Sequence, residues 1–272
     1  MFQGLRLAAL LAGLSLPAAA IVVPIGPVSD FEAYGDLFFN GVGRLTITKT
    51  TGSVGCSGSL LSTGYHVLTA AHCVTDSSGV LNATAATAEF PTGIGPVFTG
   101  ITVTNFVVHP SWTGALGLGD LAILELVSMA PAALTRYDLY SGSMSVHDVV
   151  TLAGYGQSGV GAANGSAFPF GTLRRGNNTY DGIWVIGSFV TDAIATDFDN
   201  GNATNNLIGL LTGNSSAGLG LGNVEVNIGP GDSGGPMFRN GMLLGVASFG
   251  LCVAFPNSSG CVFPARREFR AG

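Results

Sequence analysis

The sequence predicts an all-β protein, either a barrel or a sandwich, and three observations support this prediction. Glycine contributes 42 of the 272 residues, which favours short strands and tight turns over long helices. Hydrophobic residues make up 47% of the chain and charged residues 10%, so the chain can bury a core and is not intrinsically disordered. Short runs of β-branched and apolar residues, each bounded by turn residues, recur along its length.

The expected strands are spread over the whole chain, with few helix-like stretches between them. They include Arg44–Lys49, His66–Thr69, Ile101–Val108, Leu121–Leu126, Val149–Ala153, Ile183–Phe189 and Met242–Ser248. The only clear helix-like stretch is short, at Ala70–Val74. Two segments are expected to be loops, Gly156–Gly171 because of its Gly, Ala and Ser, and Asp197–Gly222 because of its Asn and Gly.

Residues 1–20 have the pattern of a secretory signal peptide. Arg6 precedes the apolar run Leu7–Leu16, and Pro17 and three alanines follow. The run is shorter than the roughly 20 residues that span a bilayer, although an uncleaved anchor or a buried helix is the alternative. We expect cleavage after residue 20, a mature chain that begins at Ile21, and a secreted, extracellular protein without a membrane segment. Export makes disulfide bonds possible.

The net charge bears on the kind of binding partner, and the cysteines limit the possible disulfide bonds. The formal net charge is −6, and the ten basic residues are scattered along the chain. A nucleic-acid partner is therefore not expected, because it requires a basic face. The four cysteines allow three disulfide connectivities; they are Cys56, Cys73, Cys252 and Cys261.

Three segments hold residues that together suit nucleophilic catalysis. Residues 68–73 read LTAAHC, residues 119–124 read GDLAIL, and residues 229–236 read GPGDSGGP. A serine hydroxyl needs a neighbouring imidazole to accept its proton, and the imidazole needs a buried carboxylate that sets its tautomer. Glycine beside the serine allows backbone N–H groups to converge on a developing negative charge. The sequence contains all these parts.

These segments carry a specific family resemblance. TAAHC at 69–73 and GDSGGP at 231–236 resemble the two signatures of the chymotrypsin/trypsin family of secreted serine proteases, and the order His, Asp, Ser also matches. The likeness implies two six-stranded antiparallel β-barrels with the active site in the cleft between them. A protease domain over 21–272 would have its first barrel at about 21–133 and its second at about 134–272.

The resemblance also implies an activity. It indicates a monomeric serine endopeptidase that hydrolyses protein or peptide substrates through an acyl-enzyme intermediate, without a cofactor or metal ion. His72 would be the general base and then the acid, Asp120 its orienting carboxylate and Ser233 the nucleophile. The N–H groups of Gly231 and Ser233 would form the oxyanion hole, and Ser248 would support Asp120.

The family pattern suggests substrate contacts as well. Ser248, Phe249 and Gly250 would pair with the substrate main chain. Asn227, six residues before the nucleophile, would lie at the floor of the specificity pocket and favour uncharged side chains, with Glu225 as the alternative floor residue.

The resemblance further implies two disulfides and a buried ion pair. Cys56 would pair with Cys73. Cys252 would pair with Cys261, because Gly229 stands where the family usually has another cysteine. A free Ile21 ammonium would pair with Asp232.

Three other interpretations of the sequence remain open. A non-catalytic homologue would bind peptides or proteins in the same cleft. The Gly-x-Ser-x-Gly pattern at 231–235 suggests a lipase or esterase, but the TAAHC segment argues against that alternative. Residues Asp197–Gly201 resemble a calcium loop but lack a suitably spaced glutamate, so that an Asn/Asp turn is preferred.

Overall fold

A computed structural model describes most of the chain from residue 21 onward. The described residues are 21–23, 27–114, 118–160, 164–186, 189–197, 206, 208–209, 220–255 and 258–266. Within them, β-strands dominate, and helical structure is limited to four short 3₁₀ helices and residues 208–209, which confirms the all-β class. The signal peptide expected at 1–20 lies outside the described residues.

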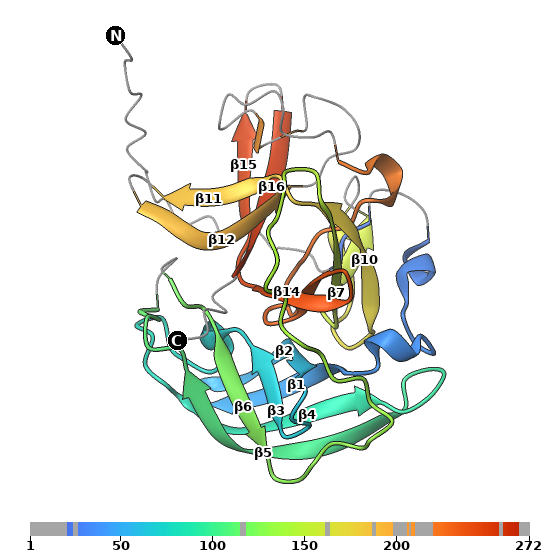
Figure 1. Ribbon diagram of the computed structural model, residues 1–272, viewed down its shortest axis with the longest axis vertical. Helices are drawn as coiled ribbons and strands as arrows, with labels where there is room; N and C mark the ends of the chain where they lie inside the picture. The colour runs from blue at the N-terminus through green and yellow to red at the C-terminus, as the bar shows by residue number, and fades with distance from the viewer. Residues whose placement is uncertain are drawn as a thin grey trace.

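The first half of the chain forms a closed six-stranded barrel (Figure 1). Its strands are β1 (Val42–Lys49), β2 (Gly52–Leu60), β3 (His66–Thr69), β4 (Ala83–Pro91), β5 (Phe98–Val108) and β6 (Ala122–Leu126), in the order β1-β2-β3-β6-β5-β4. Pairing of β1 with β4 closes the ring. The first predicted barrel is thus confirmed.

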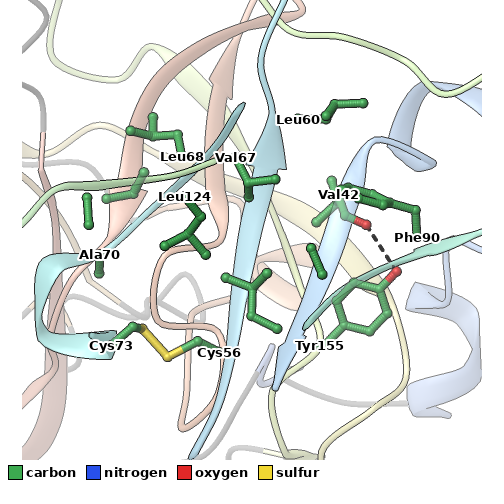
Figure 2. Packing of buried hydrophobic residues seen from close by; sticks show 14 of the residues in the cluster. Val42, Cys56, Leu60, Val67, Leu68, Ala70, Cys73, Phe90, Leu124 and Tyr155 are labelled. Carbon is green, nitrogen blue, oxygen red and sulfur yellow. Dashed lines mark hydrogen bonds between the residues drawn. A yellow bond between two sulfur atoms is a disulfide. The ribbon is translucent and has the colours of Figure 1, made fainter. Parts of the chain in front are cut away.

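Buried and exposed side chains alternate along the strands, and the buried ones fill the interior of this barrel. In β1, Leu45 and Ile47 are fully buried while Thr46 and Thr48 are exposed, as the two-residue period of a strand requires. Figure 2 shows the core of the barrel, where side chains from several strands pack together. Tyr155, from the second half, inserts into the same core, and its hydroxyl donates to the Val42 carbonyl at 3.1 Å (Figure 2).

The second half forms an eight-stranded sheet among the described residues. Its strands are β7 (Val149–Gly154), β10 (Arg174–Thr179), β11 (Gly182–Ile186), β12 (Phe189–Asp197), β13 (Pro236–Arg239), β14 (Met242–Ala247), β15 (Leu251–Phe255) and β16 (Ser258–Arg266). The order is β10-β7-β13-β14-β16-β12-β11, with β15 on β16. Figure 1 shows this sheet above the barrel. The strands that the structure describes give no pairing between β10 and β11, so the second closed barrel stays a prediction.

The expected strands are all present, with one subdivision. The run Ile183–Phe189 belongs to two strands, because Ile186 of β11 pairs with Phe189 of β12 in a hairpin. The helix-like stretch Ala70–Val74 contains the 3₁₀ helix η3 (Ala71–Cys73). Most of the loop expected at 197–222 lies outside the described residues; η4 (Gly222–Val224) ends it.

The loop prediction for Gly156–Gly171 is wrong. This segment contains a hairpin of β8 (Ser158–Val160) and β9 (Asn164–Phe168). The Ser158 hydroxyl donates to the Ile21 carbonyl at 2.8 Å, and Val23 forms a parallel bridge with Val160. Contacts with a segment distant in sequence thus impose a strand conformation on residues whose composition is typical of a loop.

The segment that precedes the barrel packs against the second half. Ile21 and Val23 are buried in the second hydrophobic core, and Val22 forms an antiparallel bridge with Asn227. Two 3₁₀ helices follow, η1 (Val28–Phe31) and η2 (Leu37–Phe39). The described part of the chain therefore begins beside Asn227, six residues before Ser233 in sequence.

Candidate active site

His72 lies in η3, directly after the short barrel strand β3. The disulfide between Cys56 and Cys73 ties η3 to β2, with Cα atoms 6.4 Å apart, and confirms the first predicted bridge. On the other side, the Lys49 ammonium donates to the carbonyl oxygens of His72 at 2.9 Å and Thr75 at 2.8 Å. Two independent attachments therefore fix the main chain that carries the imidazole.

Asp120 lies on the turn that leads into β6 and contacts His72 twice. Its Oδ1 accepts the His72 backbone N–H at 2.9 Å, and its Oδ2 lies 2.8 Å from His72 Nδ1. The preceding Gly119 has φ +74°, and a Cβ there would lie 2.4 Å from His109 Nδ1. Only glycine fits this tight turn, which turns the carboxylate toward the imidazole.

The environment of Asp120 favours the carboxylate form. Burial opposes ionisation, but the charge and hydrogen bonds of His72 and a hydrogen bond from Ser248 outweigh it, so the pKa of the Asp120 carboxyl is lowered. The Ser248 hydroxyl donates to Oδ2 at 2.5 Å. The imidazole remains 35% exposed while the carboxylate is 3% exposed. A buried acceptor thus holds a ring whose other edge can face a substrate.

Ser233 lies in a tight turn just before β13. Its carbonyl accepts the Ser57 backbone N–H from β2 at 2.8 Å. The following Gly234 has φ +78°, and a Cβ there would lie 2.0 Å from Thr69 Oγ1. The turn therefore packs closely against β3, the barrel strand that precedes His72.

The end of β14 connects the turn of Ser233 with Asp120. The Ala247 carbonyl accepts the Gly234 N–H at 2.8 Å, and the next residue, Ser248, donates to Asp120. The three sequence segments that contain His72, Asp120 and Ser233 thus meet around one strand end, although 161 residues separate the first from the last.

Asp232, next to Ser233, is fully buried and receives three backbone N–H groups. The Ile21 nitrogen lies 2.7 Å from its Oδ2, the Gly156 nitrogen 2.8 Å from Oδ1 and the Gly229 nitrogen 3.1 Å from Oδ2. Burial raises the pKa of the Asp232 carboxyl to about 6, against the effect of these hydrogen bonds. The contact expected between Ile21 and Asp232 is present.

Gly231 occupies a position that excludes any side chain. Its φ is +94°, and a Cβ would lie 2.5 Å from the Phe170 ring and 3.0 Å from the Gly156 Cα. The Pro230 carbonyl before it accepts the Gln157 N–H at 2.9 Å. These contacts define the backbone on which the expected oxyanion hole would depend.

The two candidates for the pocket floor are both buried. The Asn227 side chain donates to the Asp197 carbonyl at 2.9 Å and accepts the Ile228 N–H at 2.9 Å. Glu225 is 0% exposed, and its Oε2 accepts the Leu221 N–H at 3.2 Å. Both side chains contact the protein's own main chain, and their roles toward a substrate stay predictions.

The residues expected to pair with substrate follow β14. Ser248 is buried, Phe249 is partly buried and Gly250 is exposed, and none of the three belongs to a strand. Just beyond them, Cys252 and Cys261 are directly opposite in the β15–β16 ladder. Their side chains lie outside the described part of the molecule, so the second bridge stays a prediction.

Several residues at this site were missed by sequence reasoning. Ser57 and Phe170 contact Gly231, and Lys49 binds the His72 carbonyl, but all three stand outside the two motifs. The position of Ser57, directly after Cys56, was the only available signal. Residues 198–205, which include the rest of the possible calcium loop, lie outside the described residues.

The described residues contain neither a candidate metal site nor a helix that could cross a membrane. No group of three or more His, Cys, Asp or Glu side chains is placed to hold a metal ion among them. The helices that the structure describes include none with the length and apolar character to cross a membrane.

Comparison with known proteins gives consistent matches. The Trypsin family model matches residues 41–180. Brachyurin of Leptuca pugilator is 29% identical over 198 residues, covering 72% of this chain and 75% of its own, and a trypsin of Saccharopolyspora erythraea is 26% identical over 209 residues, covering 75% and 79%.

Solved structures share the fold. A structure described as HL collagenase has a TM-score of 0.60 at 20% identity and covers 87% of this chain and 91% of its own. A thermostable serine protease, AL20, from an extremophilic microorganism has a TM-score of 0.55 at 15% identity, with 85% and 92% covered.

The fold and the homologues together define a class, the β-barrel serine peptidases, which are hydrolases of protein or peptide substrates. Within that class the match over residues 41–180, about half of the chain, is decisive. This chain belongs to the Trypsin family.

Proposed function

We propose that this protein is a secreted serine endopeptidase that cleaves peptide bonds with Ser233, His72 and Asp120. The observation that carries the proposal is the pair of contacts between Asp120 and His72, at 2.9 and 2.8 Å, beside the turn of Ser233. A dedicated carboxylate on Nδ1 leaves Nε2 of the imidazole as the proton acceptor. The two family signatures surround His72 and Ser233.

In the proposed reaction, the Ser233 hydroxyl attacks the carbonyl carbon of the scissile peptide bond. His72 Nε2 takes the hydroxyl proton, and the carbonyl oxygen becomes an oxyanion that the N–H groups of Gly231 and Ser233 stabilise. His72 then gives the proton to the leaving amine as the acyl-enzyme forms. A water molecule, activated by His72, hydrolyses the ester and restores Ser233.

Asp120 keeps its negative charge throughout this cycle. Its lowered pKa means that the carboxylate stabilises the imidazolium rather than accepting its proton. The hydroxyl of Ser248 holds the carboxylate in place at 2.5 Å, so that both oxygens of Asp120 stay directed toward His72.

Removal of residues 1–20 would create the active N-terminus. The Ile21 nitrogen already lies within hydrogen-bond distance of Asp232, and cleavage after residue 20 would convert it to an ammonium. A buried carboxylate gains most from a full positive charge, and Asp232 adjoins both Gly231 and Ser233.

Activity-based labelling tests the proposal. The mature protein should react with a serine-directed fluorophosphonate at one residue, and peptide mapping should place the label on Ser233. Ser233→Ala should not be labelled, and should lose cleavage of a peptide library that the wild type cleaves. A wild-type protein that is folded, begins at Ile21 and neither reacts nor cleaves would instead be a non-catalytic homologue.

The library also tests the specificity proposal. Either Asn227 or Glu225 would set the charge of the pocket floor. The variants Asn227→Asp and Glu225→Gln are therefore compared with the wild type. We expect the wild type to prefer uncharged residues before the scissile bond. Cleavage after Arg or Lys that is lost only in Glu225→Gln would assign the floor to Glu225.

A further inference from the structure

Ser57 is a fully buried residue of β2, and its hydroxyl and backbone N–H together make three hydrogen bonds beside Ser233. Its hydroxyl donates to the Gly231 carbonyl at 2.8 Å and accepts the Tyr155 N–H at 3.0 Å. Its own backbone N–H donates to the Ser233 carbonyl at 2.8 Å. One residue of the barrel therefore holds two carbonyl groups of the turn that carries the candidate nucleophile.

These bonds act on the orientation of peptide units. In a trans peptide, the carbonyl and the N–H point in opposite directions. The unit that contains the Gly231 N–H has its carbonyl on Pro230, and that carbonyl is held by Gln157 at 2.9 Å. The next unit carries the Gly231 carbonyl, and Ser57 holds it. Hydrogen bonds thus fix the peptide units on both sides of the Gly231 Cα.

Gly231 needs such attachments because of its conformation. Its φ of +94° is open to glycine alone, and glycine crosses between backbone conformations more easily than any other residue. The Phe170 ring blocks one direction of movement. The peptide unit after Gly231 is held at both ends: the Asp232 N–H donates to the Gly229 carbonyl at 3.0 Å, and the Ser57 hydroxyl donates to the Gly231 carbonyl at 2.8 Å.

We propose that Ser57 is a positioning residue for the oxyanion hole: its hydroxyl locks the peptide unit after Gly231, and Gln157 holds the unit before it. With both units held, the backbone cannot rotate about the Gly231 Cα, and the Gly231 N–H stays directed at the developing negative charge. This inference rests on the proposed function. Ser57 touches no reacting atom and acts through Gly231. Preorganised donors stabilise a transition state more than donors that must reorient, because no reorganisation is needed during the reaction.

The chain offers a matched control two residues away on the same strand. Ser59 is also 0% exposed, and the described residues provide no hydrogen-bond partner for its Oγ. Ser57→Ala and Ser59→Ala therefore delete the same atom from the same buried strand. Only the first deletes a bond to the turn of Ser233.

The test compares the two variants as mature proteins. We expect Ser57→Ala to lower kcat by about 10- to 100-fold, as a slightly misplaced oxyanion donor would, with KM within about twofold of the wild type. The second-order rate of fluorophosphonate labelling should fall in parallel, because the phosphonyl oxygen occupies the same hole. The shape of the pH–rate profile should not change, since Asp120 and His72 are untouched. Ser59→Ala should keep wild-type rates.

Equal kcat and labelling rates in Ser57→Ala and Ser59→Ala would overturn the proposal, and so would a shifted pH–rate profile in Ser57→Ala. If Ser57→Ala is too unstable to assay, Ser57→Thr replaces it, because threonine keeps the hydroxyl. A kcat of this variant within about tenfold of the wild-type value would support the proposal. A larger loss of kcat in folded protein would refute it. A wild type that is neither labelled nor active defeats the proposed function itself, which separates the two failures.

Discussion

The backbone nitrogen of Ile21 lies 2.7 Å from Oδ2 of Asp232, across 211 residues of sequence. Ile21 is 1% exposed, and Asp232 is 0% exposed. Burial raises the pKa of the Asp232 carboxyl to about 6. This contact links the N-terminal segment to the residue directly before the candidate nucleophile, so the chemical state of the Ile21 nitrogen should affect both stability and activity.

A free Ile21 ammonium should stabilise the protein most near neutral pH. With an extended N-terminus, the folded state keeps a proton on Asp232 between the usual aspartate pKa of about 4 and about 6, so stability falls as pH rises through that window. An ammonium favours the carboxylate, lowers this pKa and removes most of the loss. The melting temperature of the form that begins at Ile21 should therefore exceed that of an extended form by more at pH 7.5 than at pH 5. A difference that is equal at both pH values would contradict this.

The proposed catalytic residues should act as a unit. The expected loss in kcat is on the order of 10⁴-fold or more and nearly equal for Ser233→Ala, His72→Ala and the double variant. The losses are nearly equal because neither residue supports catalysis without the other. Circular dichroism should confirm that each variant is folded. Additive losses in the double variant would argue against a shared proton transfer between these two residues.

Gly154→Ala should lower activity through Asp232. A Cβ at this position would lie 2.2 Å from Asp232 Oδ1 and 3.2 Å from Ser57 Oγ, so the carboxyl group must move. The control is Gly182→Ala, where nothing lies within 4 Å of the added carbon. Labelling with fluorophosphonate should slow in the first variant and not in the second. Equal labelling rates would mean that the site tolerates a displaced Asp232.

Lys49→Met should loosen the segment that holds His72. The single lysine of the chain donates to the carbonyl oxygens of His72 and Thr75, and burial lowers the pKa of its ammonium. Methionine keeps the length of the side chain but not the donors. We expect a loss of about 1 to 3 kcal/mol in the free energy of unfolding, measured by urea denaturation, together with a lower kcat. Unchanged stability would mean that water replaces the ammonium without cost.

Asp181→Asn should improve stability in alkaline solution. Burial and the neighbouring charge of Asp197 raise the pKa of the Asp181 carboxyl to about 8. The folded state therefore keeps a proton that the unfolded state has already lost, and stability falls as pH rises from about 4 to about 8. Asparagine cannot ionise, so the free energy of unfolding should decline less between pH 6 and pH 9. Parallel curves for both proteins would show that Asp181 is not responsible for the decline.

The sequence alone predicted the class of fold and the residues that carry the proposed chemistry. Alternating residues such as Leu45 and Ile47 indicated strands, because burial on one face of a strand leaves a two-residue period in the sequence. Motifs around His72, Asp120 and Ser233 were visible because chemistry requires particular residue types. The bridge between Cys56 and Cys73 was inferred from the same resemblance and is present.

Only the tertiary structure determined how these residues are held. Ser57 lies outside the two motifs, and the role proposed for it follows from two hydrogen-bond partners, Gly231 and Tyr155, that are distant in sequence. The hairpin at 158–168 likewise depends on contact with the segment that begins at Ile21. Local composition reports the preferences of a segment, whereas a hydrogen bond across more than a hundred residues depends on how the whole chain packs. The supporting contacts of the site are of this second kind, and the sequence by itself does not encode them in any local pattern.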